Sequence, residues 1–169
     1  MERTATTRDD PAAGIWRRAL AGAAFVLVLD QATKLAVRQC ISPDAPIIVV
    51  SGFLYLRHAL NDGAAWSILR GARWLLSGVS VAALAALFHW RRDILALGPR
   101  LGVWTFALLT GGIAGNLIDR LATGKVVDFL DFQFGTYHYP TFNVADSAIC
   151  VGVFLHIVAT LLTGRRKGN

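Results

Sequence analysis

The sequence holds few residues that could build a covalent or metal-linked framework. Its only two cysteines, Cys40 and Cys150, form neither a disulfide framework nor a CxxC pair, and Cys150 is expected to be a small core residue. His58, His138 and His156 show no metal-ligand spacing with one another. No serine or cysteine lies in a nucleophile motif, and no glycine-rich phosphate loop is present. We therefore predict neither a metal nor an organic cofactor.

Acidic residues are also scarce, with 11 Asp and Glu against 17 Lys and Arg and a net charge of +6. A positive excess indicates nucleic-acid binding when it forms a basic stripe on a folded surface. Here the basic residues form short clusters between apolar runs, which is typical of a membrane topology signal. The predicted partners are membrane lipids and no nucleic acid.

Apolar residues are abundant, at 54% of the chain, with a mean hydropathy of +0.49. About 20 apolar residues in a helix cross a hydrocarbon core of ~30 Å. Four runs near that length contain no proline: 15–37, 74–90, 101–118 and 144–162. The first has no small-x-small cleavage pattern nearby, so we expect a retained helix rather than a cleaved signal peptide. The predicted fold class is an all-α integral membrane protein, with 1–169 as a single membrane domain of four transmembrane helices.

Basic residues near the ends of the runs predict the orientation. The larger and denser group is Arg3, Arg8, Arg17, Arg18, Arg91, Arg92, Arg100, Arg165, Arg166 and Lys167. This group puts the tails 1–14 and 163–169 in the cytoplasm, so that segments 38–73 and 119–143 face outward. The first outward segment has β-prone runs, IIVV and FLYLRHA, and is expected to form a small sheet. The second, at 126–142, is rich in aromatic residues that suit the lipid headgroup region, and its pattern leaves open whether 127–142 form a helix or a strand.

Polar residues gather at the predicted outer ends of the runs, although ionisable groups in a span cost ~2.5–3.5 kcal/mol each. They are Asp30, Lys34, Asn61, Gly63, Asn116, Asp119, Arg120, Asp128, Asn143 and Asp146. The cytoplasmic ends carry ordinary arginines together with His89 and Asp93. Five separate stretches therefore converge on one leaflet, which predicts a functional site there.

Structural explanations exist for single members of this set. Asp30 and Lys34 share a helix face and could form only an anchoring ion pair. Asn143 could be a helix N-cap and Asp146 a first-turn acid. The GxxxG spacing in GGIAGNLIDR is more typical of close helix packing than of chemistry.

Aspartates at the membrane boundary suggest acid–base chemistry. Two carboxylates held close together cannot both ionise readily, so one keeps a proton while the other activates water. Asp128 and Asp146 are candidates for such a pair, and Asp119 and Asp131 are rivals on composition alone.

At these residues the sequence resembles the lipoprotein signal peptidases, also called signal peptidase II. The matching motifs are DQATK with Asp30 and Lys34, NDGAAWS with Asn61 and Gly63, GNLIDR with Asn116 and Arg120, VVDF with Asp128, and FNVADS with Asn143, Ala145 and Asp146. They run in order from the first apolar run to the start of the fourth. Trp66 departs from the family's usual phenylalanine, a change that would alter a lipid or peptide groove.

The resemblance implies that Asp128 and Asp146, rather than Asp119 or Asp131, are the catalytic dyad of an aspartic endopeptidase. It also implies a set of residues that bind the substrate and orient the dyad: Asn61, Gly63, Asn116, Arg120, Asn143, Asp30 and Lys34. The implied substrate is a bacterial prolipoprotein whose lipobox cysteine carries diacylglycerol and whose signal peptide is removed. The implied location is the bacterial cytoplasmic (inner) membrane, with the active site at the outer face.

Two other classes of protein remain open on the residues alone. In a small proton-coupled transporter, Asp30, Lys34 and Asp146 would form a relay, but transporters usually place such groups near the midplane and show repeat symmetry. A non-catalytic assembly factor using the GxxxG contacts would leave Asp128 and Asp146 without a role.

Overall fold

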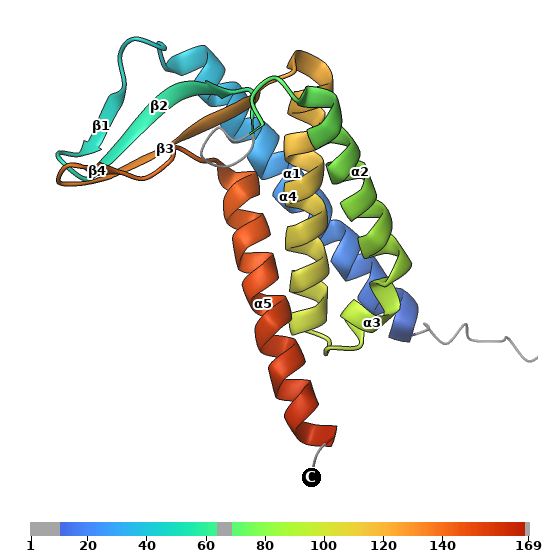
Figure 1. Cartoon of the computed structure of the whole chain (residues 1–169). Helices are drawn as coiled ribbons and strands as arrows, with labels where there is room; N and C mark the ends of the chain where they lie inside the picture. The colour runs from blue at the N-terminus through green and yellow to red at the C-terminus, as the bar shows by residue number, and fades with distance from the viewer. Residues whose placement is uncertain (1–10, 64–68, 168–169) are drawn as a thin grey trace, which may run out of the picture.

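A computed structural model describes residues 11–63 and 69–167, so Trp66 and the arginines of the N-terminal tail lie outside the described residues. The described chain is mostly helical and carries one small sheet at one end of the helices (Figure 1). The helices are α1 (Pro11–Cys40), α2 (Arg73–His89), α3 (Arg91–Leu95), α4 (Leu101–Thr123) and α5 (Val144–Lys167). The strands are β1 (Ile47–Val50), β2 (Leu54–Asn61), β3 (Val126–Phe134) and β4 (Tyr137–His138).

Each of the four apolar runs forms a helix, but the helices differ in length from the predicted spans. Within the described residues, three are long and apolar enough to cross a membrane: Ala12–Cys40, Leu101–Thr123 and Val144–Thr163. Helix α2 is apolar but has only 17 residues, which at 1.5 Å per residue is roughly 26 Å and short of the ~30 Å core. The helices α1 and α5 extend beyond their apolar runs and include the polar residues that flank them.

Helix α4 forms the centre of the helical layer and packs against α1, α2 and α5. Glycine allows two of these close approaches. A Cβ at Gly111 would lie 2.7 Å from the carbonyl oxygen of Ala23 in α1, and one at Gly112 would lie 2.6 Å from that of Ala145 in α5. Gly111, the first glycine of the GxxxG spacing, therefore serves helix packing as predicted, whereas Gly115 makes room for the side chain of Asp30.

The sheet is antiparallel with the strand order β1-β2-β3-β4. The sequence left open whether residues 127–142 form a helix or a strand. Residues of this aromatic segment form β3 and β4. In the register between β2 and β3, Ala59 lies opposite Asp128 and Asn61 opposite Val126. The two segments predicted to face outward are thus parts of one sheet, while α3, the start of α1 and the end of α5 lie at the opposite end of the molecule (Figure 1).

A hydrophobic cluster fixes the sheet to the helices. Val37 and Ile41 at the end of α1 pack against Val127 and Phe129 of β3, and all four side chains are buried. Because side chains alternate along a strand, burying Val127 and Phe129 toward α1 turns Asp128 to the other face. This packing positions Asp128 beside the ends of α4 and α5.

Candidate functional site

Strand β3 carries two acids that point to opposite faces. Asp128 lines a cavity between the sheet and the helix ends. Asp131 is an odd number of residues away, so it faces the other side, where it pairs with Arg57 of β2 and accepts a hydrogen bond from Gln133 Nε2 at 2.9 Å. Asp131 is therefore neutralised by a neighbour and lies apart from the cavity.

The start of α5 is a capping box. The backbone N–H of Asp146 donates to Asn143 Oδ1 at 2.9 Å, and the backbone N–H of Asn143 donates to Asp146 Oδ2 at 3.2 Å. The structural explanation for these two residues is thus correct. It does not compete with a functional one, because the same hydrogen bonds hold the Asp146 carboxylate at the cavity wall.

Three asparagines connect the two cavity aspartates. Asn61 Nδ2 donates to one oxygen of Asp128 at 2.9 Å, and Asn143 Nδ2 donates to the other at 2.7 Å. Asn116 Nδ2 donates to Asp146 Oδ1 at 2.7 Å. Each carboxylate oxygen therefore accepts a hydrogen bond from the protein, and the two acids are held in fixed orientations relative to one another.

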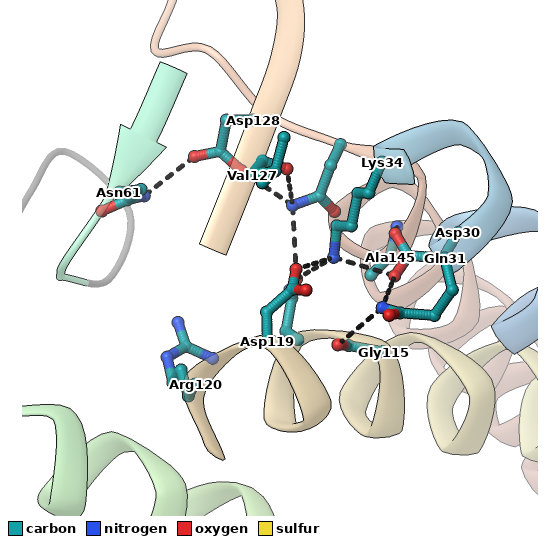
Figure 2. A network of polar contacts seen from close by, with 12 residues as sticks. Asp30, Gln31, Lys34, Asn61, Gly115, Asp119, Arg120, Val127, Asp128 and Ala145 are labelled. Atoms are coloured by element: carbon teal, nitrogen blue, oxygen red, sulfur yellow. Dashed lines mark hydrogen bonds and ion pairs between the residues drawn. The ribbon is translucent and has the colours of Figure 1, made fainter. Parts of the chain in front are cut away.

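Lys34 is fully buried and lies beside Asp30 and Asp119 (Figure 2). Lys34 Nζ is 2.8 Å from Asp30 Oδ2, 2.9 Å from Asn116 Oδ1 and 2.9 Å from Asp119 Oδ2. The second oxygen of Asp30 accepts the backbone N–H of Ala145 at 2.9 Å. These contacts tie α1, α4 and α5 together at one depth. They also neutralise Asp119, which pairs further with Arg38 at 3.0 Å.

Arg120 and the NDG turn form another part of the site. Arg120 lines the cavity and donates from a terminal nitrogen to the carbonyl oxygen of Gly63 at 3.2 Å. The backbone N–H of Gly63 in turn donates to Asn61 Oδ1 at 2.9 Å. This turn fixes the amide of Asn61 so that its nitrogen faces Asp128, as Figure 2 shows.

The cavity has a volume of about 770 Å³ and contrasting walls. Its polar wall contains Asn61, Asn116, Arg120, Asp128 and Asp146, and its apolar wall contains Phe132, Phe134, Tyr139 and Phe142. Such a space suits an amphipathic ligand whose polar part reaches the carboxylates. Sequence reasoning missed Cys150, which is exposed on this wall and not in the core. Its position one helical turn after Asp146 could have revealed this.

The surroundings of Asp128 change its acidity. Burial, and to a smaller extent the charge of Asp146, raise the pKa of Asp128 from its ordinary 3.8 to about 7. Hydrogen bonds from Asn61 and Asn143 favour the ionised form and act against this rise. Asp128 can therefore hold a proton near neutral pH, which an exposed aspartate would not do.

The polar groups of the site are gathered together and are not spread along the helices as in a transport pathway. They belong to β2, β3, the C-terminal half of α1, the end of α4 and the start of α5, and hydrogen bonds join them to one another. Among residues 11–63 and 69–167, no three His, Cys, Asp or Glu side chains are grouped in a way that could hold a metal ion.

The sequence and the fold of the chain are both similar to those of known proteins. The family described as signal peptidase (SPase) II matches residues 22–162. The lipoprotein signal peptidase of Bacillus pumilus is 42% identical over 145 residues, covering 85% of this chain and 92% of that protein. The lipoprotein signal peptidase of Symbiobacterium thermophilum is 41% identical over 150 residues, covering 87% and 95%.

Solved structures of two bacterial membrane enzymes are also similar. One, determined by the in meso method at 2.3 Å resolution, has a TM-score of 0.78 and 34% identity, covering 88% of this chain and 90% of that one. The other, determined at 1.9 Å, has a TM-score of 0.73 and 35% identity, covering 85% and 92%. By sequence and by fold, the chain belongs to the signal peptidase II family of membrane peptidases, which remove signal peptides from prolipoproteins.

Proposed function

We propose that this chain is an aspartyl endopeptidase that cleaves lipid-modified bacterial prolipoproteins immediately before the diacylglyceryl-cysteine. The observation that carries the proposal is that Asp128 and Asp146, from β3 and α5, line one cavity and are bridged by Asn143. The rival acids are unsuitable, because Asp119 and Asp131 are each paired with a cation outside the cavity lining.

In the proposed reaction a water molecule lies between the two carboxyl groups. The ionised carboxylate accepts a proton from the water, and the water oxygen attacks the scissile carbonyl carbon. The protonated carboxyl, which we take to be that of Asp128 because its pKa is raised to about 7, donates its proton toward the carbonyl oxygen. The resulting tetrahedral diol then collapses: the ionised Asp128 takes back a proton from one hydroxyl as the C=O bond re-forms, the C–N bond breaks, and the proton taken from water goes to the amine of the lipidated cysteine.

The remaining residues orient the reacting groups. Asn116 and Asn143 keep their amide nitrogens on the carboxylates, so little reorganisation is needed during the reaction. Arg120, Asn61 and Gly63 form the polar wall along which the substrate backbone would run. The aromatic wall offers apolar surface to the lipid-bearing end of the substrate.

We further propose the membrane arrangement on which this depends. The chain forms a single membrane domain in the bacterial inner membrane, and α2 completes a set of four spans despite its length. The basic residues near α3 and near the start of α1 support a cytoplasmic location for that end and for both termini. The sheet and the cavity then face outward, where the acyl chains of the substrate can stay in the lipid.

The direct test is incubation of the purified protein with a prolipoprotein that carries diacylglycerol on its lipobox cysteine. We expect release of the signal peptide, and mass spectrometry of the product should show the lipidated cysteine as the new N-terminus. The same precursor without the lipid is the control and is expected to be cleaved poorly. Cleavage at another bond, or no cleavage, would contradict the proposal.

The orientation is tested by labelling single cysteines in intact cells. In a background with Cys40 and Cys150 replaced by serine, Thr136→Cys lies at the exposed turn between β3 and β4, and Ala96→Cys is exposed beside α3. An impermeant thiol reagent is expected to label Thr136→Cys from outside and Ala96→Cys only after the cells are opened. The reverse pattern would overturn the topology.

The pH dependence of kcat/KM tests the shared proton. Because burial raises the pKa of Asp128 to about 7, the required proton is lost as the pH rises through that value, and kcat/KM is expected to fall about tenfold per pH unit above it. At acidic pH the second carboxylate is protonated and activity falls again. Asn61→Ala removes a hydrogen bond that favours the ionised form, so its alkaline limb should move to higher pH. A flat profile, or a shift in the other direction, would contradict the assignment.

A further inference from the structure

A second cavity lies at the opposite end of the helices from the sheet. Its volume is about 580 Å³, and residues of α2, α3, α4 and α5 line it. Helices α2 and α5 each pack against α4, which forms the wall between them. Most of the lining is apolar, including Leu87 of α2 and Leu109 and Ile113 of α4. The proposed reaction makes no use of this space.

The two cavities follow the same helix faces. On α4, Leu109 and Ile113 of the second cavity continue into Asn116 and Arg120 of the first at spacings of three and four residues. On α5, Ile149 lines the first cavity, while His156, two helical turns later, and Thr160 line the second. Residues three or four apart share a face of a helix. A ligand bound along this face would therefore extend from the two aspartates to the far end of the molecule.

The dimensions of this face match one class of ligand. Asp146 and Thr160 are separated by about 21 Å along α5 at ~1.5 Å per residue. A signal peptide has an apolar h-region of ~7–15 residues, which as a helix is roughly 10–22 Å long. When its cleavage site is at Asp146, the start of its h-region reaches the second cavity.

The charge at the far end is complementary to the same ligand. Asp93 of α3 lines the second cavity and is exposed. Within the described residues it forms no ion pair and is the only acid at this end, where Arg91, Arg92 and Arg100 surround it in sequence. Signal peptides begin with a positively charged n-region directly before the h-region. The arginines would repel such a segment, whereas Asp93 would attract it.

We propose that the second cavity binds the N-terminal part of the substrate's signal peptide, and that Asp93 pairs with a lysine or arginine of its n-region. This inference rests on the proposed function. Asp93 thereby acts as a specificity residue that sets the depth of the signal helix, with the scissile bond held at the other end. It does not take part in the reaction.

The test combines variants of Asp93 with two lipidated peptide substrates, assayed in detergent micelles so that membrane insertion plays no part. One substrate has lysines in its n-region, and in the other these are glutamines. Exposed ion pairs contribute about 0.3–1 kcal/mol, so Asp93→Asn is expected to raise KM for the lysine substrate about two- to five-fold with kcat unchanged. Asp93→Lys should raise it further. Neither variant should change KM for the glutamine substrate.

Asp44→Asn is the matched control, because it removes the same charge from an exposed position in the loop beside the sheet. It is expected to leave both KM values unchanged. If the wild-type protein cleaves both substrates and Asp93→Asn raises neither KM, the n-region inference is wrong while the proposed function stands. If the wild-type protein cleaves neither substrate, the proposed function itself fails.

Cross-linking tests the placement of the helix independently of charge. In the cysteine-free background, Thr160→Cys lies on the cavity face of α5, and Leu162→Cys lies at nearly the same depth on the opposite face. A cysteine near the start of the substrate's h-region is expected to form a disulfide with Thr160→Cys and not with Leu162→Cys. Equal cross-linking of both, or of neither, would overturn the proposed binding path.

Discussion

Asp128→Asn and Asp146→Asn are each expected to lower kcat for prolipoprotein cleavage about 10³-fold or more while the protein still inserts and folds. Acid–base groups in the transition state contribute ~10²–10⁴-fold each, and an amide can neither accept the proton of water nor give one to the carbonyl. The measurement is single-turnover cleavage of a lipidated precursor, which separates the chemical step from product release.

Asp131→Asn is the matched control, since this acid lies on the same strand but faces Arg57. It should keep activity within about threefold, although it leaves Arg57 without its partner and costs some stability. An inactive Asp131→Asn together with an active Asp128→Asn would reverse our assignment of the dyad.

Stability provides a second readout for the Asp128 variant. Because burial raises the pKa of Asp128 from 3.8 to about 7, the folded protein binds this proton more tightly than the unfolded chain does. The stability that this gives is fully present below about pH 4 and is lost as the pH rises through about 7. Asp128→Asn is therefore expected to melt at a higher temperature than the wild type at pH 8, with the difference shrinking toward pH 4.

Lys34→Ala is expected to cause the largest loss of stability, of about 3–5 kcal/mol, because it leaves buried carboxylates without their cation. Lys34 and Asp30 are both 0% exposed, and Lys34 also pairs with Asp119. The double variant Asp30→Ala/Lys34→Ala removes one of these acids, and Arg38 still pairs with Asp119. Part of the stability should therefore return, as thermal unfolding of the four members of the cycle would measure.

Cleavage by the double variant distinguishes a structural pair from one that also orients the site. Asp30 accepts the backbone N–H of Ala145, next to Asp146, and Lys34 contacts the amide oxygen of Asn116. We expect the folded double variant to cleave at least tenfold more slowly, and Asp30→Asn, which keeps an acceptor for Ala145, to retain more activity. Full activity in a well-folded double variant would leave Asp30 and Lys34 as a helix anchor only.

The sequence was most informative where hydropathy and charge act over long stretches. The apolar runs predicted the helices, and the cost of placing charge in lipid predicted that the polar residues share one end. It was less informative where a neighbour from another segment decides. Asp131 is paired with Arg57 on β2, which is far from it in the sequence. No local pattern could therefore predict that Asp131, and not Asp128, is neutralised.

Three further differences have similar causes. The aromatic segment could have formed a helix, but pairing with β2 makes it a strand, and that hydrogen bonding is absent from its own sequence. The apolar surroundings of Cys150 suggested the core, yet α5 turns this side toward a cavity. A turn before α2 and helix α3 after it limit the length of α2. The hydropathy of the run predicted neither.

The capping box at the start of α5 couples helix dynamics to ligand binding. Asp146, whose Oδ2 accepts the backbone N–H of Asn143, also lines the cavity in which we propose that the substrate binds. A ligand that takes this oxygen removes one of the two hydrogen bonds of the capping box, and the first turn of α5 should then fray more readily. Backbone hydrogen exchange at 143–146 would then report occupancy of the cavity, even for substrates that are cleaved too slowly to assay and for inhibitors that are not cleaved.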